Sequence, residues 1–261
     1  MRFGAMQSIL KRSGRELFRA AAEAGFDGVE LNVREGLGDP LLTTAGLAEV
    51  KAGARQTRLA VPSLCLGALN RFGYTSEAPE DRQRTTALIQ RAIDICHEVG
   101  ARVILVPFFG RSEIQDAAGK QRVVAGMQEV APLAERAGVI LGLENTLSAE
   151  ENLALIEQIG APAVKVYFDV ANATWWGHES PAEIRRLGGA IAQVHFKDCR
   201  NSPGDAMLGE GRVSFPAVVE ALRAIGYEGW IVLESAAPHD PVEDARANLR
   251  FSRVCFGLVG G

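Results

Sequence analysis

Short apolar runs alternate with longer amphipathic segments along the whole chain. Eight of these runs have the length and composition of strands that are buried on both faces, as in a parallel sheet. They cover residues 3–6, 28–33, 59–66, 103–108, 139–145, 164–170, 191–198 and 230–234. Strands that alternate with helices in this way predict parallel pairing and an α/β fold.

The segments between these runs predict helices. Over residues 81–99, apolar side chains recur at the spacing of one helical face, and Gly100 follows as a C-cap. The segments that end at Gly25 and Gly226 have the same order of helix, glycine and strand. Each of these helices therefore ends at a residue that tolerates a left-handed backbone.

The number of strand–helix units favours a closed barrel over an open, doubly wound sheet. A GxGxxG motif after the first strand or a GxxxxGK[ST] motif would indicate an open nucleotide-binding sheet, and the sequence contains neither. The chain has 261 residues, and a single (β/α)₈ barrel usually has about 250. No linker or shift in composition divides the sequence, so we expect one barrel domain over residues 1–261.

Composition and charge narrow the expected partners and location. Hydrophobic residues make up 47% and charged residues 23% of the chain, as in soluble globular proteins. The net charge of −4 gives no sign of a basic surface for nucleic-acid phosphates, so we expect no nucleic-acid partner. The four cysteines form no CxxC pair, and no apolar run is long enough for a signal peptide or a membrane span. We expect a cytoplasmic protein with no membrane partner.

The last strands end in residues that can bind a metal ion. Four apolar runs lead into Glu144, Asp169, His195 and Glu234. Because the carboxyl ends of barrel strands converge on one mouth, these side chains are expected to meet there. Each one alone could instead cap its strand by bonding to a neighbouring loop. A carboxylate on a buried strand is costly unless it is paired or metal-bound, so the set favours one divalent ion: Mn²⁺, Mg²⁺, Co²⁺ or Zn²⁺.

Several segments resemble the xylose-isomerase-like superfamily of sugar epimerases and isomerases. The resemblance rests on LEN at 143–145, FDVAN at 168–172, VHFKD at 194–198, LGEG at 208–211, GYEGW at 226–230 with Glu234, and AGFDGVEL at 24–31. It covers essentially the whole chain. It implies a (β/α)₈ barrel that binds a divalent metal ion through Glu144, Asp169, His195 and Glu234.

The ketose 3-epimerase branch of this superfamily implies catalysis by proton transfer. The metal ion would bind a ketose carbonyl oxygen and an adjacent hydroxyl group, acidify the neighbouring C–H and stabilise an enediolate. Glu144 and Glu234 are then the catalytic pair, in which one removes a proton from one face and the other delivers a proton to the opposite face. The expected substrate is a small sugar, a sugar phosphate or a polyol-derived compound.

Further residues near the strand ends are candidates for substrate contact. These are Glu30, Asn172, Trp175, His178, Lys197 and Arg200. Asn172 stands where the epimerase branch usually has a substrate-binding histidine, and Arg200 lies near the position of its arginine. Trp175 could pack on sugar C–H groups or be buried in the rim. Glu30 could contact substrate or orient a helix.

An isomerase is the leading hypothesis, by epimerisation or aldose–ketose isomerisation. A lyase, such as a dehydratase of a keto-cyclitol or dehydroshikimate-like substrate, would need the same stabilised enolate and then lose a β-hydroxyl group. An enzyme of the endonuclease IV type would need a histidine-rich trinuclear zinc cluster, and the third and fourth predicted strands contain no histidine. A non-catalytic sugar-binding barrel would have to maintain the strand-end charges without a metal. The resemblance is compatible with a homodimer or a homotetramer.

Overall fold

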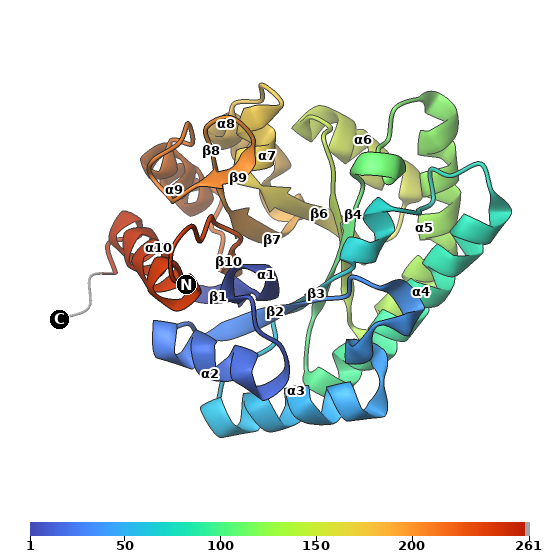
Figure 1. Ribbon diagram of the computed structural model, residues 1–261. Coiled ribbons are helices and arrows are strands. Elements are labelled where there is room, and N and C mark those ends of the chain that lie inside the picture. Colours follow the sequence, from blue (N-terminus) through green and yellow to red (C-terminus); the bar gives the residue numbers. More distant parts are fainter. Residues whose placement is uncertain (259–261) are drawn as a thin grey trace.

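The computed structural model describes residues 1–258, in which eight parallel strands close into a barrel (Figure 1). The barrel strands are β1 Arg2–Met6, β2 Gly28–Asn32, β3 Ser63–Cys65, β4 Val103–Pro107, β5 Ile140–Glu144, β6 Val164–Asp169, β7 Ile191–Phe196 and β10 Trp230–Leu233. Their order around the ring is β1-β10-β7-β6-β5-β4-β3-β2, and β1 pairs with both β2 and β10. The predicted (β/α)₈ barrel is therefore confirmed.

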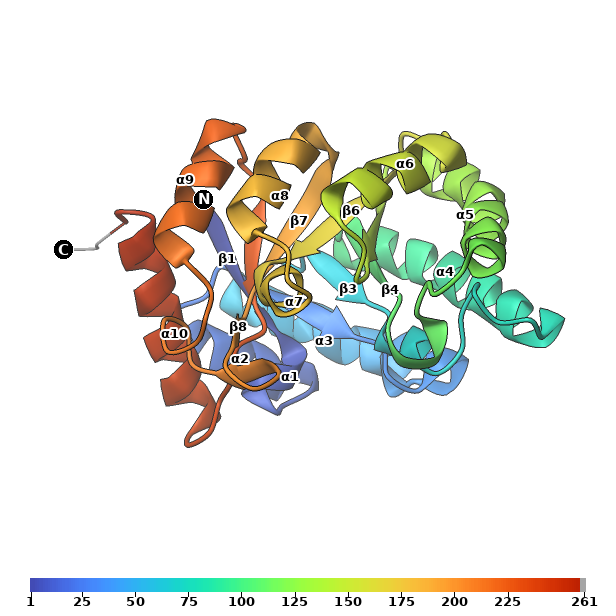
Figure 2. The ribbon, with the colours of Figure 1, turned by 90° about the horizontal axis from the view of Figure 1, so that it is seen from above.

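Helices follow the strands along the chain. They are α1 Gln7–Leu10, α2 Gly14–Ala24, α3 Thr44–Thr57, α4 Pro79–Val99, α5 Ala117–Ala137, α6 Ala149–Ile159, α7 Val170–Trp175, α8 Ser180–Leu187, α9 Phe215–Ala224 and α10 Pro241–Cys255. All but the short α1 and α7, which lie at the barrel mouth, surround the outside of the barrel. Figure 2 shows α4, α5 and α6 on one side of the molecule and α8, α9 and α10 on the other. None of the helices within residues 1–258 has the length and apolar character of a membrane span.

Shorter elements fill the loops. A two-stranded antiparallel hairpin, β8 Asp198–Cys199 with β9 Pro203–Ala206, follows β7. Turns of 3₁₀ helix occur at Gly36–Gly38, Pro40–Leu42, Gly67–Asn70, Gly110–Ser112 and Gly188–Ala190. Several of these elements follow the carboxyl ends of barrel strands, so they build the walls of the barrel mouth.

The third strand is shorter than the predicted run of residues 59–66. β3 comprises only Ser63–Cys65, and Ala60 forms an isolated bridge to Gly28. Pro62 lies between Ala60 and Ser63 and has no N–H group to donate to a strand ladder. Regular pairing of this strand therefore begins only after the proline.

The strand side chains alternate between the outer helices and the barrel interior. In β4, Ile104 and Val106 belong to the large core under the helices, whereas Val103 and Leu105 belong to a second apolar cluster. That second cluster consists of Met6, Cys65, Val103, Leu105, Tyr167, Trp230 and Val232. Its members are the inward-facing residues, so the interior is filled by side chains, as is usual for this type of barrel.

Candidate metal centre and active site

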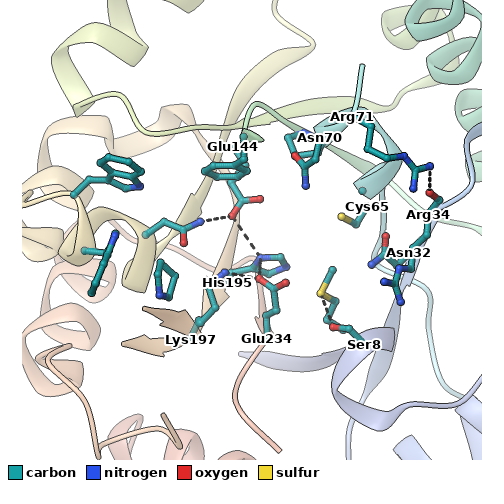
Figure 3. Close-up of a pocket in the computed structure, with 18 residues that line it drawn as sticks. Ser8, Asn32, Arg34, Cys65, Asn70, Arg71, Glu144, His195, Lys197 and Glu234 are labelled. Atoms are coloured by element: carbon teal, nitrogen blue, oxygen red, sulfur yellow. Dashed lines mark hydrogen bonds and ion pairs between the residues drawn. The ribbon is translucent and has the colours of Figure 1, made fainter. Parts of the chain in front are cut away.

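The alternation of side chains directs the strand-end residues into the barrel mouth. In β5, Leu143 packs in the outer core, so the next residue, Glu144, faces inward. Asp169 ends β6 and pairs in register with His195 of β7, and Glu234 directly follows β10. Figure 3 shows Glu144, His195 and Glu234 converging from separate strands.

The four residues have the geometry of a metal site. Each offers one ligand atom, and these atoms all lie within 4.8 Å of one another. Nδ1 of His195 lies 3.4 Å from Oε2 of Glu234, 3.8 Å from Oδ2 of Asp169 and 3.9 Å from Oε1 of Glu144. These distances exceed ordinary hydrogen bonds. They match the separation of roughly 3–4 Å between neighbouring ligands that each lie about 2.1 Å from a cation.

One polar atom at the centre of this group supports the same conclusion. Nδ1 of His195 is buried and has no hydrogen-bond partner among residues 1–258. Leaving such an atom unsatisfied costs about 1–3 kcal/mol. The donor set and this nitrogen therefore fit a divalent cation, which Glu144, Asp169, His195 and Glu234 would hold.

Glu30 lies beneath this site, where it orients His195. Its side chain is fully buried, and Oε1 lies 2.8 Å from Nε2 of His195. Oε2 accepts hydrogen bonds from the hydroxyl groups of Ser63 at 2.6 Å and Tyr167 at 2.7 Å. Gln193 donates to both hydroxyl groups, at 2.6 and 2.9 Å. A carboxylate that holds one nitrogen of a histidine leaves the other nitrogen to bind a metal.

Glu30→Gln is expected to weaken metal binding by about 10–100-fold, as loss of an outer carboxylate partner usually does. The amide removes the charge that stabilises the His195 ring and brings an N–H donor where Ser63 and Tyr167 also donate. Competition with a chromophoric chelator measures the Kd. Glu35→Gln, at an exposed position after the same strand, is the matched control. An unchanged Kd in Glu30→Gln would show that Glu30 does not orient the ligand.

Lys197 places a buried positive charge beside the carboxylates. Its Nζ donates to Oε2 of Glu234 at 2.7 Å and forms an ion pair with Oδ2 of Asp169 at 3.0 Å. Burial opposes the charge on Lys197, but Asp169, Glu234 and Glu144 outweigh that effect and raise its pKa well above the ordinary value. Lys197 is therefore protonated and offsets part of the negative charge of the site.

The two glutamates of the group lie in different electrostatic surroundings. Burial raises the pKa of Glu144, although His195 opposes this shift, and Asn172 donates to Oε1 of Glu144 at 2.9 Å. Burial also opposes ionisation of Glu234, but the charge of Lys197 outweighs it and lowers the pKa of Glu234. The two carboxyl groups are therefore electrostatically distinct before a cation binds.

The metal centre forms part of the wall of a cavity of about 590 Å³ (Figure 3). This volume falls within the range of about 300–1,000 Å³ that small-molecule sites have. Among the candidates for substrate contact, Asn172, Trp175 and Lys197 line the cavity. The ring of Trp175 also lies under the guanidinium of Arg212, 4.8 Å from the ring centre, which fixes its orientation.

The other candidates for substrate contact lie outside this cavity. Glu30 is buried below it, as described above. Arg200 is exposed, and its guanidinium donates to the backbone oxygen of Glu210 at 3.0 Å. His178 lines a smaller neighbouring pocket, where its Nε2 lies 3.2 Å from the backbone oxygen of Thr146.

The cavity also has a wall that strand-end patterns do not identify. On the side of β1, β2 and β3 it is lined by Met6, Ser8, Asn32, Arg34, Cys65, Gly67, Asn70 and Arg71. The alternation of side chains along the strand could have identified Asn32, because it lies two residues after Glu30 and so faces inward as well. The arginines lie in loops, where no periodicity fixes the direction of a side chain.

Comparisons with known proteins agree with this geometry. A sequence profile described as "Xylose isomerase-like TIM barrel" matches residues 18–255. The chain belongs to this family. The match includes all four proposed metal ligands, so the family assignment and the site rest on the same part of the chain.

Similar members of the xylose isomerase-like family include named epimerases. The chain is 31% identical to the L-ribulose-5-phosphate 3-epimerase UlaE of Salmonella paratyphi B, over 94% of this chain and 91% of the relative. It is 29% identical to the 2-epi-5-epi-valiolone 7-phosphate 2-epimerase of an Actinoplanes species, over 85% of this chain and 82% of that relative. The solved structure of an L-ribulose 3-epimerase superposes with a TM-score of 0.83 at 22% identity, covering 98% of this chain and 94% of that one, which supports the fold.

Proposed function

We propose that the protein is a divalent-metal-dependent sugar epimerase that inverts a carbon next to a ketose carbonyl. The arrangement of Glu144 and Glu234 carries this proposal. In the ring of strands, β6 and β7 lie between β5 and β10. Glu144 and Glu234 therefore stand at the two ends of the ligand set, and both line the cavity. A substrate held between them presents opposite faces to the two carboxyl groups.

The proposed reaction uses both positions. A bound divalent cation would supply Lewis-acid polarisation of the carbonyl, which acidifies the adjacent C–H. Glu234, which accepts a hydrogen bond from Lys197, removes this proton from carbon. Glu144, on the other side of the ligand set, delivers a proton to the opposite face of the same carbon. The two residues exchange roles when the opposite epimer is the substrate.

The relatives support inversion over the other chemistries of this scaffold. Both curated relatives described above are named as epimerases of a phosphorylated compound. Within residues 1–258, the ligand group contains His195 as its only histidine, in contrast to the histidine-rich cluster that an endonuclease of this fold would need. We propose that the bound ion is one of Mn²⁺, Mg²⁺, Co²⁺ and Zn²⁺.

The direct test is product identification by NMR. Protein loaded with each of the four candidate ions is incubated with ketopentoses, ketohexoses, their phosphates and a keto-cyclitol. We expect a mixture of two epimers at a carbon next to the carbonyl, reached from either side. An aldose product would instead identify an aldose–ketose isomerase, and loss of water would identify a dehydratase. Fully metal-loaded protein that changes none of these compounds would contradict the proposed function.

A further inference from the structure

Two arginine side chains line the cavity away from the metal centre. Arg34 follows β2, and Arg71 follows the 3₁₀ turn Gly67–Asn70 after β3. Figure 3 shows both across the cavity from Glu144 and His195. We propose that Arg34 and Arg71 bind an anionic group of the substrate, at the end remote from its reacting carbonyl. This inference rests on the proposed function, because it takes the metal centre as the site of the carbonyl.

Neither guanidinium group is neutralised by a carboxylate of residues 1–258. Within residues 1–258, no carboxylate oxygen lies within 4.0 Å of the side-chain nitrogens of Arg34 or Arg71. Arg71 donates instead to the backbone oxygen of Arg34 at 2.6 Å, a contact that orients the side chain and leaves its charge uncompensated. The backbone N–H of Arg34 donates to the buried carboxylate of Asp39 at 2.7 Å, which fixes this loop. Two arginines that line one cavity are suited to a carboxylate or a phosphate.

The rim beside these arginines adds positive charge. Lys11 and Arg12 follow α1 and line an adjoining pocket that also includes Arg34. The acidic residue of that pocket, Glu16, forms an ion pair with Arg19 at 2.6 Å, so its charge is compensated on the outer side. The positive charge at this end of the cavity therefore favours the approach of an anion. A neutral sugar would gain nothing from this charge.

Two asparagines lie between the carboxylate wall and the arginines in the lining of the cavity. Oδ1 of Asn32 and Oδ1 of Asn70 are buried and have no hydrogen-bond partner among residues 1–258. A Cβ atom at Gly67 would lie 2.7 Å from Oδ1 of Asn32, so the glycine is what allows this carboxamide to occupy its place. Both oxygens are covered by protein atoms, so the two asparagines help to shape this wall of the cavity. The inferred substrate is thus a compound with a carbonyl at one end and a phosphate or carboxylate at the other.

The test compares three ketoses of the same configuration: one neutral, one with a terminal phosphate and one with a terminal carboxylate. For metal-loaded wild-type protein, we expect kcat/KM to be about 100-fold higher for at least one anionic ketose than for the neutral one, from hydrogen bonds to charged groups. The preferred anion identifies the class as sugar phosphate or sugar acid. Equal kcat/KM values for all three ketoses would overturn the inference.

Substitution of the arginines assigns the effect to this wall. Arg34→Gln and Arg71→Gln are expected to raise KM for the preferred anionic ketose by about 10–100-fold with a smaller change in kcat. Arg111→Gln is the matched control, because Arg111 is exposed on a 3₁₀ turn after β4 and does not line the cavity. Arginine variants that retain the wild-type KM would contradict the inference.

A binding measurement separates this inference from the proposed function. Inorganic phosphate is titrated calorimetrically into metal-loaded wild-type protein and into the Arg34→Gln/Arg71→Gln double variant. If no ketose is turned over but the double variant binds phosphate at least about 10-fold more weakly, the anion site stands and the epimerase proposal fails. If ketoses are inverted but phosphate binds both proteins equally, the epimerase proposal stands and the anion site fails.

Discussion

Glu144→Gln and Glu234→Gln are each expected to lower kcat by about 10²–10⁴-fold, which is the usual contribution of a positioned proton-transfer group. Glutamine has nearly the same size as glutamate, and its side-chain oxygen can still accept the hydrogen bonds from Asn172 or Lys197. It cannot take up or deliver a proton at the substrate carbon. The barrel should therefore stay folded while turnover is lost.

Three measurements distinguish loss of proton transfer from loss of the site. The kcat is measured at saturating metal, the metal content is measured by elemental analysis, and the midpoint of thermal unfolding reports the fold. Glu210→Gln is the control, because Glu210 is exposed beside the same mouth and should behave like wild type. Near-native turnover in Glu144→Gln or Glu234→Gln would remove that residue from the proton-transfer pair.

His195→Ala is expected to abolish stoichiometric metal binding. His195 is the nitrogen ligand of the group, and its removal leaves three carboxylates together with the charge of Lys197. Loss of an outer hydrogen-bond partner usually weakens metal binding by about 10–100-fold. The loss in His195→Ala should be larger, because this substitution removes a direct ligand. Elemental analysis after exhaustive dialysis should therefore find about one ion per chain in wild type and far less in the variant.

The control for this experiment is His97→Ala. His97 is exposed in the last turn of α4, away from the barrel mouth, so its removal should leave the metal content unchanged. If His195→Ala retained one ion per chain, the proposed ligand set would be wrong. A variant of His195 that failed to fold would be replaced by His195→Gln, which keeps a polar group beside Glu30.

The barrel was predictable because its elements follow simple periodic patterns. The runs that lead into Glu144, Asp169, His195 and Glu234 are strands whose inward positions alternate with the outer core, so their ends had to converge. The predicted helix over residues 81–99 also matches the structure, since α4 ends at Val99 and Gly100 follows with φ of +79°. In both cases the interactions that decide the structure are local or strictly repetitive.

The depth of a residue within the barrel was harder to predict. Glu30 resembles the other strand-end acids in sequence, but β2 continues to Asn32, and Glu30 pairs in register with Met6 of β1. It therefore lies one layer below the mouth and contacts His195 rather than the cavity. Register depends on the pairing of neighbouring strands, which a single strand sequence does not specify.

The direction of loop side chains could not be predicted for a similar reason. Arg200 follows the strand of His195, yet the hairpin β8–β9 turns it outward, where its backbone N–H donates to Asp205 at 2.6 Å. Arg34 and Arg71 have no periodic signal, and the contact that orients Arg71 joins its side chain to the backbone oxygen of Arg34 in another loop. Such contacts join residues far apart in the chain, so composition and spacing do not reveal them.

If one glutamate removes a proton from carbon and the other replaces it, deuterium from the solvent enters the product. Metal-loaded protein is incubated in D₂O with a ketose that it inverts, and the product is analysed by NMR. Because Glu144 and Glu234 line an open cavity, each exchanges its proton with solvent. We expect one deuterium at the inverted carbon of every product molecule and none without metal. An inverted product that retains its original hydrogen would contradict this expectation, since the hydrogen would then have moved directly within the substrate.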